Sequence, residues 1–239
     1  DSTNIRAKLA GETDGTHGAL FVANEQNAGR GRRGRAWSTP KGTSIAMTFL
    51  LRPDVPIENV SRLTILSALA TARALADTAG LQAQIKWPND IVVNGKKLAG
   101  ILTEMSTQID YIDHVTVGVG INVNTRQFPK DIKERATSLY MECGHTVRRA
   151  PVIASIMECL EKNYRIFLET EDLTGLMDSY MSMLVNRDKE VLVLTPKGEY
   201  KAHALGINKK GELIVRREDG TQEAIYAGEV SVRGVYGYV

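Results

Sequence analysis

The residues with the clearest chemical potential stand in a seven-residue segment, GRGRRGR at positions 29–35, which holds three glycines and four arginines. Glycines free the backbone and guanidinium groups bind carboxylates and phosphates, so this segment can wrap an anion. It lacks the GxxxxGK[ST] order of the phosphate-binding loop found in nucleotide hydrolases. On these residues alone, an anion-binding loop, a nucleic-acid-binding stretch and a solvated surface loop are equally open.

The surroundings of this segment argue against the nucleic-acid alternative. The formal net charge of the whole chain is only +2, so it is not a polyelectrolyte built for nucleic acid. The nearest aromatic residue is Trp37, which is not part of a repeated aromatic series.

A second group comprises KWPND at positions 86–90 and KLAGIL at positions 97–102. A polar turn between two apolar strands can serve only to reverse the chain, and Asn89 and Asp90 suit that purpose. Lys97 is harder to explain in this way, since it begins a run made almost entirely of apolar residues and glycine. Gly100 lacks a side chain, which would let a ligand approach the backbone closely.

A third pattern pairs Gly118 with Gly120 in the apolar run VGVGIN at positions 117–122. Residues two apart on a strand lie on the same face, so the two glycines could form the floor of a slot. A bulge or a groove that packs a helix explains the same pattern equally well.

The composition is that of a globular protein, with 239 residues, of which 43% are hydrophobic and 24% charged. Two cysteines without a CxxC pair and four scattered histidines support neither a disulfide framework nor a structural zinc site. No apolar run approaches the roughly 20 residues that span a bilayer, and no signal sequence opens the chain. We therefore expect a cytoplasmic protein that does not enter the membrane.

The elements that position these residues follow from caps and periodicity. The cluster Asp1-Ser2-Thr3-Asn4 predicts the start of a helix, and apolar spacing predicts further helices over residues 60–79, from Pro151 onward and over roughly 173–184. Gly80 is expected to end the first of these, and Pro151 to occupy the first helical position of the next. Strands are expected at 19–24, 43–51, 84–87, 90–93, 97–105 and 115–123, with Asn94-Gly95 as a hairpin turn.

After Asn186 the sequence changes to short β runs separated by turns at 196–198, 208–211 and 218–220. Five such strands in about fifty residues favour a small barrel. We therefore predict two domains. Residues 1–185 form an α+β domain, with helices on one side of a mixed, mostly antiparallel sheet, and residues 186–239 form a small all-β domain.

Five motifs in order resemble the biotin–protein ligase family: STN at 2–4, the QxxGRGRRGRxW loop at 26–37, KWPND at 86–90, KLAGIL at 97–102 and GxGxN at 118–122. Each is moderately specific, and their ordered combination is highly so. The resemblance spans the chain, since the family also ends in a small Src-homology-like barrel. It implies a class II synthetase-like catalytic domain, and the arginine–glycine loop favours the biotin branch over the related lipoate ligases.

In that family Ser2, Thr3 and Gln26 would hydrogen-bond the ureido ring of biotin, while Gly118 and Gly120 would form the floor of its slot. The whole set that the resemblance assigns to biotin is Ser2, Thr3, Asn4, Gln26, Gly29, Arg30, Gly31, Arg32, Lys97, Gly100, Leu102, Gly118 and Gly120. Trp37 would stack on adenine, although a core or lid role is the simpler alternative for it. The set assigned to ATP and the adenylate is Arg32, Arg33, Arg35, Trp37, Lys86, Asn89, Lys97 and Asn122.

The resemblance implies that ATP and biotin are substrates, that Mg²⁺ accompanies the triphosphate and that a lysine of a biotin carboxyl carrier protein is the acceptor. The biotin carboxylate is ionised at neutral pH, so its activation needs cations rather than a general base. The expected catalytic residues are Lys97, Arg30, Arg32 and Asp90. Asp90 would hold the acceptor ammonium or contact magnesium, and the residues that bind the metal are not identified.

The loop is expected to be mobile without ligand, because its four like charges repel and would lack contact with the core. No helix-turn-helix precedes Ser2, so the repression performed by bifunctional family members is not assigned to these residues, and no DNA-binding domain is expected within them. A homodimer is the expected assembly. A lipoate-type ligase and a nucleic-acid-binding protein are the alternatives that we retain.

Overall fold

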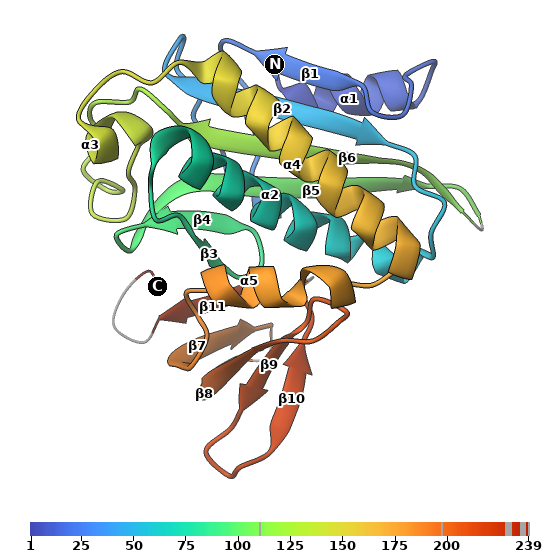
Figure 1. Ribbon diagram of the computed structural model, residues 1–239, viewed down its shortest axis with the longest axis vertical. Coiled ribbons are helices and arrows are strands. Elements are labelled where there is room, and N and C mark those ends of the chain that lie inside the picture. The colour runs from blue at the N-terminus through green and yellow to red at the C-terminus, as the bar shows by residue number, and fades with distance from the viewer. Residues whose placement is uncertain (110, 197, 228–230, 235–237, 239) are drawn as a thin grey trace.

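A computed structural model describes residues 1–109, 111–196, 198–227, 231–234 and 238 of the chain. Its larger part is built on a six-stranded sheet whose neighbouring strands all pair antiparallel (Figure 1). Parallel pairing among the described residues is limited to isolated bridges, such as that between Lys97 and Ala136. In pairing order the strands are β1 (Leu20–Ala23), β2 (Ser44–Leu51), β6 (Ile112–Asn122), β5 (Lys96–Thr107), β4 (Asp90–Val93) and β3 (Gln84–Lys86).

Two long helices, α2 (Ser61–Ala79) and α4 (Arg149–Thr170), lie side by side across one face of this sheet (Figure 1). From Val115 to Ile121 the odd-numbered residues of β6, including Val117 and Val119, are buried in the core with α2. Successive residues on a strand point to opposite faces, so Gly118 and Gly120 lie on the other side. There α1 (Thr3–Gly11) contacts β1, β2 and β6.

The predicted helix boundaries hold where the capping signal is strong. Gly80 adopts a left-handed conformation with φ of 65°, and its N–H donates to the carbonyl of Ala76 at 2.9 Å. Pro151 was expected at the first helical position, but α4 begins two residues earlier, at Arg149. The first-turn N–H groups of any helix have no partner within it, so a proline is tolerated at the third position as well.

Short elements were not predicted from the sequence. They are the 3-10 turns η1 (Arg32–Gly34) and η2 (Ile57–Asn59) and the helix α3 (Leu139–Cys143). The helix predicted over residues 173–184 is divided between a third 3-10 turn, η3 (Thr174–Leu176), and α5 (Met177–Met183). Elements of three to five residues offer too few positions for a periodic pattern to appear.

The remaining strands form a second, five-stranded sheet, which confirms the predicted β-rich C-terminal region. In pairing order they are β10 (Gln222–Ile225), β9 (Leu213–Arg216), β8 (Gly198–Ile207), β7 (Lys189–Thr195) and β11 (Ser231–Gly234). The last helix, α5, ends at Met183 and the second sheet begins at Lys189, while the domain boundary at 185/186 stays a prediction. One continuous cluster of buried apolar residues joins both sheets.

No helix among the described residues is long and apolar enough to cross a membrane.

Candidate active site

The sheet face opposite α2 and α4 carries a connected series of polar side chains, which we call the polar chain. Gln26 joins its first members, because Gln26 Nε2 donates to Thr39 Oγ1 at 3.0 Å and Gln26 Oε1 accepts from the Thr3 N–H at 2.7 Å. Thr48 Oγ1 on β2 lies 2.8 Å from both Thr3 Oγ1 and Asn4 Oδ1. These neutral donors and acceptors suit a polar ring without charge.

Glu104 on β5 continues the polar chain to the arginine–glycine loop, residues 28–35. Its Oε2 accepts from Asn4 Nδ2 at 2.8 Å, and its Oε1 lies 3.1 Å from Arg30 Nη2. The polar chain therefore links α1, β2, β5 and the loop on one side of the sheet.

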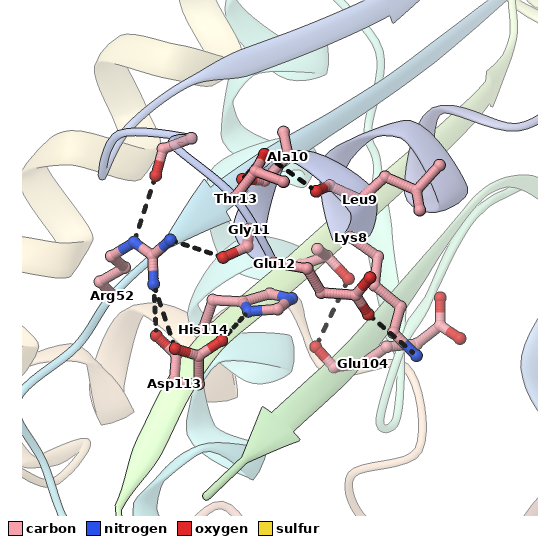
Figure 2. Close-up of polar contacts among 12 residues, drawn as sticks. Lys8, Leu9, Ala10, Gly11, Glu12, Thr13, Arg52, Glu104, Asp113 and His114 are labelled. Carbon is pink, nitrogen blue, oxygen red and sulfur yellow. Dashed lines mark hydrogen bonds and ion pairs between the residues drawn. The ribbon is translucent and has the colours of Figure 1, made fainter.

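The helix α1, which begins with Thr3 and Asn4, is held at its other end by a second network (Figure 2). Arg52 Nη2 donates to the carbonyl of Gly11 at 2.6 Å, and Arg52 Nη1 donates to the carbonyl of Asp113 at 2.9 Å. His114 Nδ1 lies 2.6 Å from Asp113 Oδ2, and a Cβ on Gly11 would stand only 2.5 Å from the imidazole ring. The C-terminal turn of α1 can pack on His114 because Gly11 has no side chain.

The two glycines of β6 are contacted by side chains from other elements. A Cβ on Gly118 would stand 2.0 Å from Asn4 Oδ1, and one on Gly120 would stand 2.4 Å from Trp37 Nε1. Real Cβ atoms do not approach so closely, so each position requires glycine for these neighbours to sit there. The predicted bare face exists, and Asn4 and Trp37 lie against it.

A compact cationic group lies beside Trp37. Lys97 Nζ lies 5.6 Å from the centroid of the Trp37 ring and 2.5 Å from Asp90 Oδ1. The second Asp90 oxygen, Oδ2, accepts from the Tyr238 hydroxyl. Lys86 lies 3.5 Å above the centroid of the Tyr238 ring, so Tyr238 touches both the carboxylate and a second lysine.

Lys86 is 5% exposed, and burial lowers its pKa to about 8. The neighbouring charges of Lys97, Arg233 and Arg35 act in the same direction, while Asp90 opposes them. Burying an ammonium group next to other cations costs free energy, and such an arrangement is typical of a site that binds an anion.

The arginine–glycine loop folds back on itself as a hairpin and contacts the rest of the molecule. Arg30 pairs with Ala36 in a β-bridge, and a Cβ on Gly29 would stand 2.2 Å from the Trp37 carbonyl oxygen. Arg32 Nη1 donates to Asn89 Oδ1 at 2.8 Å, and Arg32 Nη2 donates to the carbonyl of Ala227 at 2.5 Å. The expectation that the loop lacks contacts with the core was therefore wrong. The acceptors, Asn89, Glu104 and Ala227, lie far from these arginines in the sequence, so no local pattern could predict the contacts.

Most of the other predicted site residues lie on the same face. Ser2 is buried at the N-cap of α1 and Leu102 is half-buried on β5. Gly100 faces Lys97 and Trp37, and Gly31 donates its N–H to the carbonyl of Arg35 at 2.7 Å. Arg33 and Arg35 are exposed on the loop, and Asn122 is buried at the end of β6, where it donates to the carbonyl of Thr137.

Sequence reasoning missed Glu104, Thr48 and Tyr238 as site residues. Glu104 continues the two-residue spacing of Gly100 and Leu102 on β5, and Thr48 interrupts the apolar run that follows Ser44 in β2, so both had a detectable signal. Tyr238 is 148 residues from Asp90 in sequence, and no local pattern connects them.

Comparison with known proteins identifies the family. The profile described as the biotin/lipoate A/B protein ligase family matches residues 2–122, and that of the biotin protein ligase C terminal domain matches residues 188–233. The chain is 37% identical over 233 residues to the bifunctional ligase/repressor BirA of Bacillus subtilis, covering 97% of this chain and 71% of that protein. It is 34% identical over 240 residues to the biotin–[acetyl-CoA-carboxylase] ligase of Paracoccus denitrificans, covering 98% of each.

Among solved structures, the biotin protein ligase from Aquifex aeolicus in complex with biotin and ATP matches with a TM-score of 0.87 and 32% identity. The match covers 98% of this chain and 95% of that one. The family expected from the five motifs is confirmed: the chain belongs to the biotin protein ligase family.

Proposed function

We propose that this protein activates biotin with ATP and transfers it to a lysine of a biotin carboxyl carrier protein. The observation that carries the proposal is the placement of two chemically different groups on one face of the sheet. Apart from Glu104, the polar chain offers neutral hydrogen-bonding groups. Lys97 lies beside Trp37, and two further cations stand on other segments, with Lys86 over the Tyr238 ring and Arg32 bonded to Asn89. A ligand with a polar uncharged ring at one end and a carboxylate at the other suits this arrangement.

In the first step a biotin carboxylate oxygen attacks the α-phosphorus of ATP, and the bond from that phosphorus to the bridging oxygen of pyrophosphate breaks. The carboxylate is ionised at neutral pH, so the protein must overcome repulsion between two anions. We assign Lys97 to bridge the carboxylate and the α-phosphate, with Arg30, Arg32 and Lys86 supporting it. Preorganised cations stabilise the charge that develops on phosphorus.

In the second step the acceptor amine attacks the acyl carbon of the mixed anhydride, the bond from that carbon to the phosphate oxygen breaks, and AMP leaves. A lysine with an ordinary pKa of about 10.4 must lose a proton before it attacks. We assign Asp90 to hold the incoming ammonium, because it is the carboxylate beside Lys97 in the described site. Both Asp90 oxygens already accept a hydrogen bond, from Lys97 and Tyr238, so the acceptor must share or displace one.

Mg²⁺ fits this site through the triphosphate rather than through a cage of protein ligands. No group of three or more histidine, cysteine, aspartate or glutamate residues in the described part of the chain could hold a metal. Magnesium commonly binds through substrate phosphates and water with few carboxylates, and it would neutralise phosphate charge here.

The roles assigned to the individual residues rest on this geometry and on the motifs. We place the biotin ring against the polar chain and the face of Gly118, and adenine against Trp37. Trp37 lies over Gly120 and Gly100, so a ligand that uses this surface would require the indole to share it or move. The homodimer and the cytoplasmic location stay predictions, which sedimentation and cell fractionation would test.

Incubation with ATP, a carrier-protein acceptor and either labelled biotin or labelled lipoate tests the proposal, with labelled RNA as a separate binding arm. We expect covalent, ATP-dependent labelling of the acceptor by biotin. Equal or better labelling by lipoate would identify a lipoate-type ligase instead. Tight RNA binding without either labelling would support the nucleic-acid alternative for the loop.

A further inference from the structure

Glu104 is the one member of the polar chain that carries a negative charge, and it pairs with Arg30, one of the cations assigned above to the anionic groups of the ligand. Its two oxygens have different partners: Asn4 holds Oε2 and Arg30 faces Oε1. The side chain is 29% exposed and that of Arg30 is 48% exposed.

The Asn4 end of Glu104 is rigid. Asn4 is 6% exposed, its Oδ1 lies 2.8 Å from the Thr48 hydroxyl, and its amide packs on Gly118. With Oδ1 facing Thr48 and Nδ2 donating to Glu104, the amide is fixed at both of its polar ends. A carboxylate held at one oxygen by such a group keeps its orientation.

The Arg30 end can exchange partners. The Arg30 backbone is held by its bridge to Ala36, so a change of partner requires only the side chain to move. An ion pair this exposed contributes little stability in water, and a carboxylate or phosphate competes for the same face of the guanidinium. The ligand's own carboxylate can therefore replace Glu104 at Arg30.

We propose that Glu104 is a positioning residue that holds Arg30 until an anionic ligand takes its place, and so sets how strongly the site prefers biotin over uncharged analogues. The inference rests on the proposed function, because it takes the carboxylate of biotin or the phosphate of the adenylate as the competing anion. Glu104 touches neither reacting atom in this account and acts through Arg30 and Asn4.

The variant Glu104→Gln separates the two ends. Glutamine keeps the size of the side chain and an amide oxygen that can accept from Asn4, but it removes the charge that faces Arg30. We expect biotin to bind about fivefold more tightly to Glu104→Gln, the gain typical of freeing a half-exposed ion pair. Biotinamide, which lacks the carboxylate, should bind with unchanged affinity. Titration calorimetry with both ligands measures this difference.

Two controls exclude other causes of tighter biotin binding. Glu161 on α4 forms an exposed ion pair with Arg165, and Glu161→Gln should change the affinity of neither ligand. In an Arg30→Gln background, Glu104→Gln should no longer favour biotin, because the guanidinium being released is absent. A persistent gain in that background would mean simple charge repulsion between Glu104 and the ligand, and would overturn the proposal.

Equal changes for biotin and biotinamide, or no gain for biotin, would also overturn it. If Glu104→Gln fails to fold, Glu104→Asp offers the same test, since one methylene fewer draws the carboxylate back from Arg30 and should again favour biotin selectively. Wild-type binding is measured in the same series. Failure of wild type to bind biotin would reject the proposed function, whereas normal wild-type binding without the selective gain would reject only the role of Glu104.

Discussion

At the scale of single residues, Lys97 contacts a carboxylate, an aromatic ring and a glycine. It pairs with Asp90 at 2.5 Å, faces the Trp37 ring and lies against Gly100, whose missing side chain leaves room for the lysine amine. Lys97 is the second residue of β5; its N–H donates to the carbonyl of Arg135, and its carbonyl accepts from the N–H of Thr137. The backbone of this lysine is thus fixed independently of its ammonium group.

We predict that Lys97→Ala folds normally and lowers the rate of adenylate formation by about 10²–10³-fold, the usual loss when one preorganised charge is removed from a transition state. Pre-steady-state release of pyrophosphate with saturating biotin measures this rate. Circular dichroism and a melting curve check the fold. A folded Lys97→Ala protein with the wild-type rate would remove Lys97 from the mechanism.

Lys86 supplies a pH dependence. With a pKa lowered to about 8 by burial, its ammonium is charged below that pH and largely neutral above it. If the charge helps to bind the triphosphate, KM for ATP should rise about tenfold between pH 7 and pH 9, following the protonated fraction. Lys86→Arg keeps its charge throughout this range and should flatten the profile.

The direction in which stability changes with pH separates the loss of ATP affinity from unfolding. Because the folded pKa lies below the ordinary 10.5, the folded state gains stability from this group as pH rises from about 8. ATP affinity should fall over the same interval. A parallel fall in melting temperature and affinity, or a Lys86→Arg profile identical to wild type, would show that Lys86 is not responsible.

At the scale of elements, the arginine–glycine loop is held by contacts that its own sequence does not predict. Arg32 reaches Asn89 in the turn after β3 and Ala227 after β10, and thereby joins the loop to two other segments. Burial lowers the pKa of Arg32 from its ordinary value, yet a guanidinium keeps its charge at neutral pH.

We expect Arg32→Gly to release biotinyl-adenylate faster, by about tenfold or more, because two hydrogen bonds made by a charged group are lost. The escaping mixed anhydride should then label lysines of an unrelated protein added in excess. Arg187→Gly, which alters an exposed arginine paired with Asp188, is the matched control. Equal off-rates for wild type and Arg32→Gly, without added labelling, would exclude Arg32 as a retention residue.

The sequence predicted elements well where a pattern repeats over many residues. The apolar spacing of α2 and α4 and the long strands β5 and β6 were recognisable because each offers several turns or alternations. Several residues of the predicted motifs lie together on one face of the sheet, but the sequence did not predict their partners. Glu104 contacts Arg30 because the Glu104 side chain and the loop lie on the same face of the sheet. That contact depends on the register in which β5 pairs with β6.

At the scale of the whole molecule, the C-terminal β region touches the site at separate points. The Ala227 carbonyl accepts from Arg32, the Tyr238 hydroxyl donates to Asp90, and the Gly211 carbonyl accepts from the Trp87 indole at 2.9 Å. Residues up to and including Asn122 supply the motifs, so sequence alone did not predict that later residues would contact them. The two parts share one apolar core and work as one structure.

We predict that Trp87→Phe lowers the free energy of unfolding by about 2–4 kcal/mol, through a lost hydrogen bond at a buried carbonyl and the space left by a smaller ring. Trp87 is 2% exposed, and its backbone N–H donates to Oδ1 of Asn186, which is also buried. Urea denaturation measures the change. An unchanged midpoint would show that this contact does not join the two parts.

The central claim is that the chain forms an adenylate from biotin. The most direct test is the exchange of labelled pyrophosphate into ATP by the wild-type protein, with biotin, lipoate or no acid added. We expect exchange that requires biotin and is weak with lipoate, because the reversible first step needs no acceptor protein. Exchange that proceeds equally without biotin, or that lipoate supports as well as biotin does, would contradict the account.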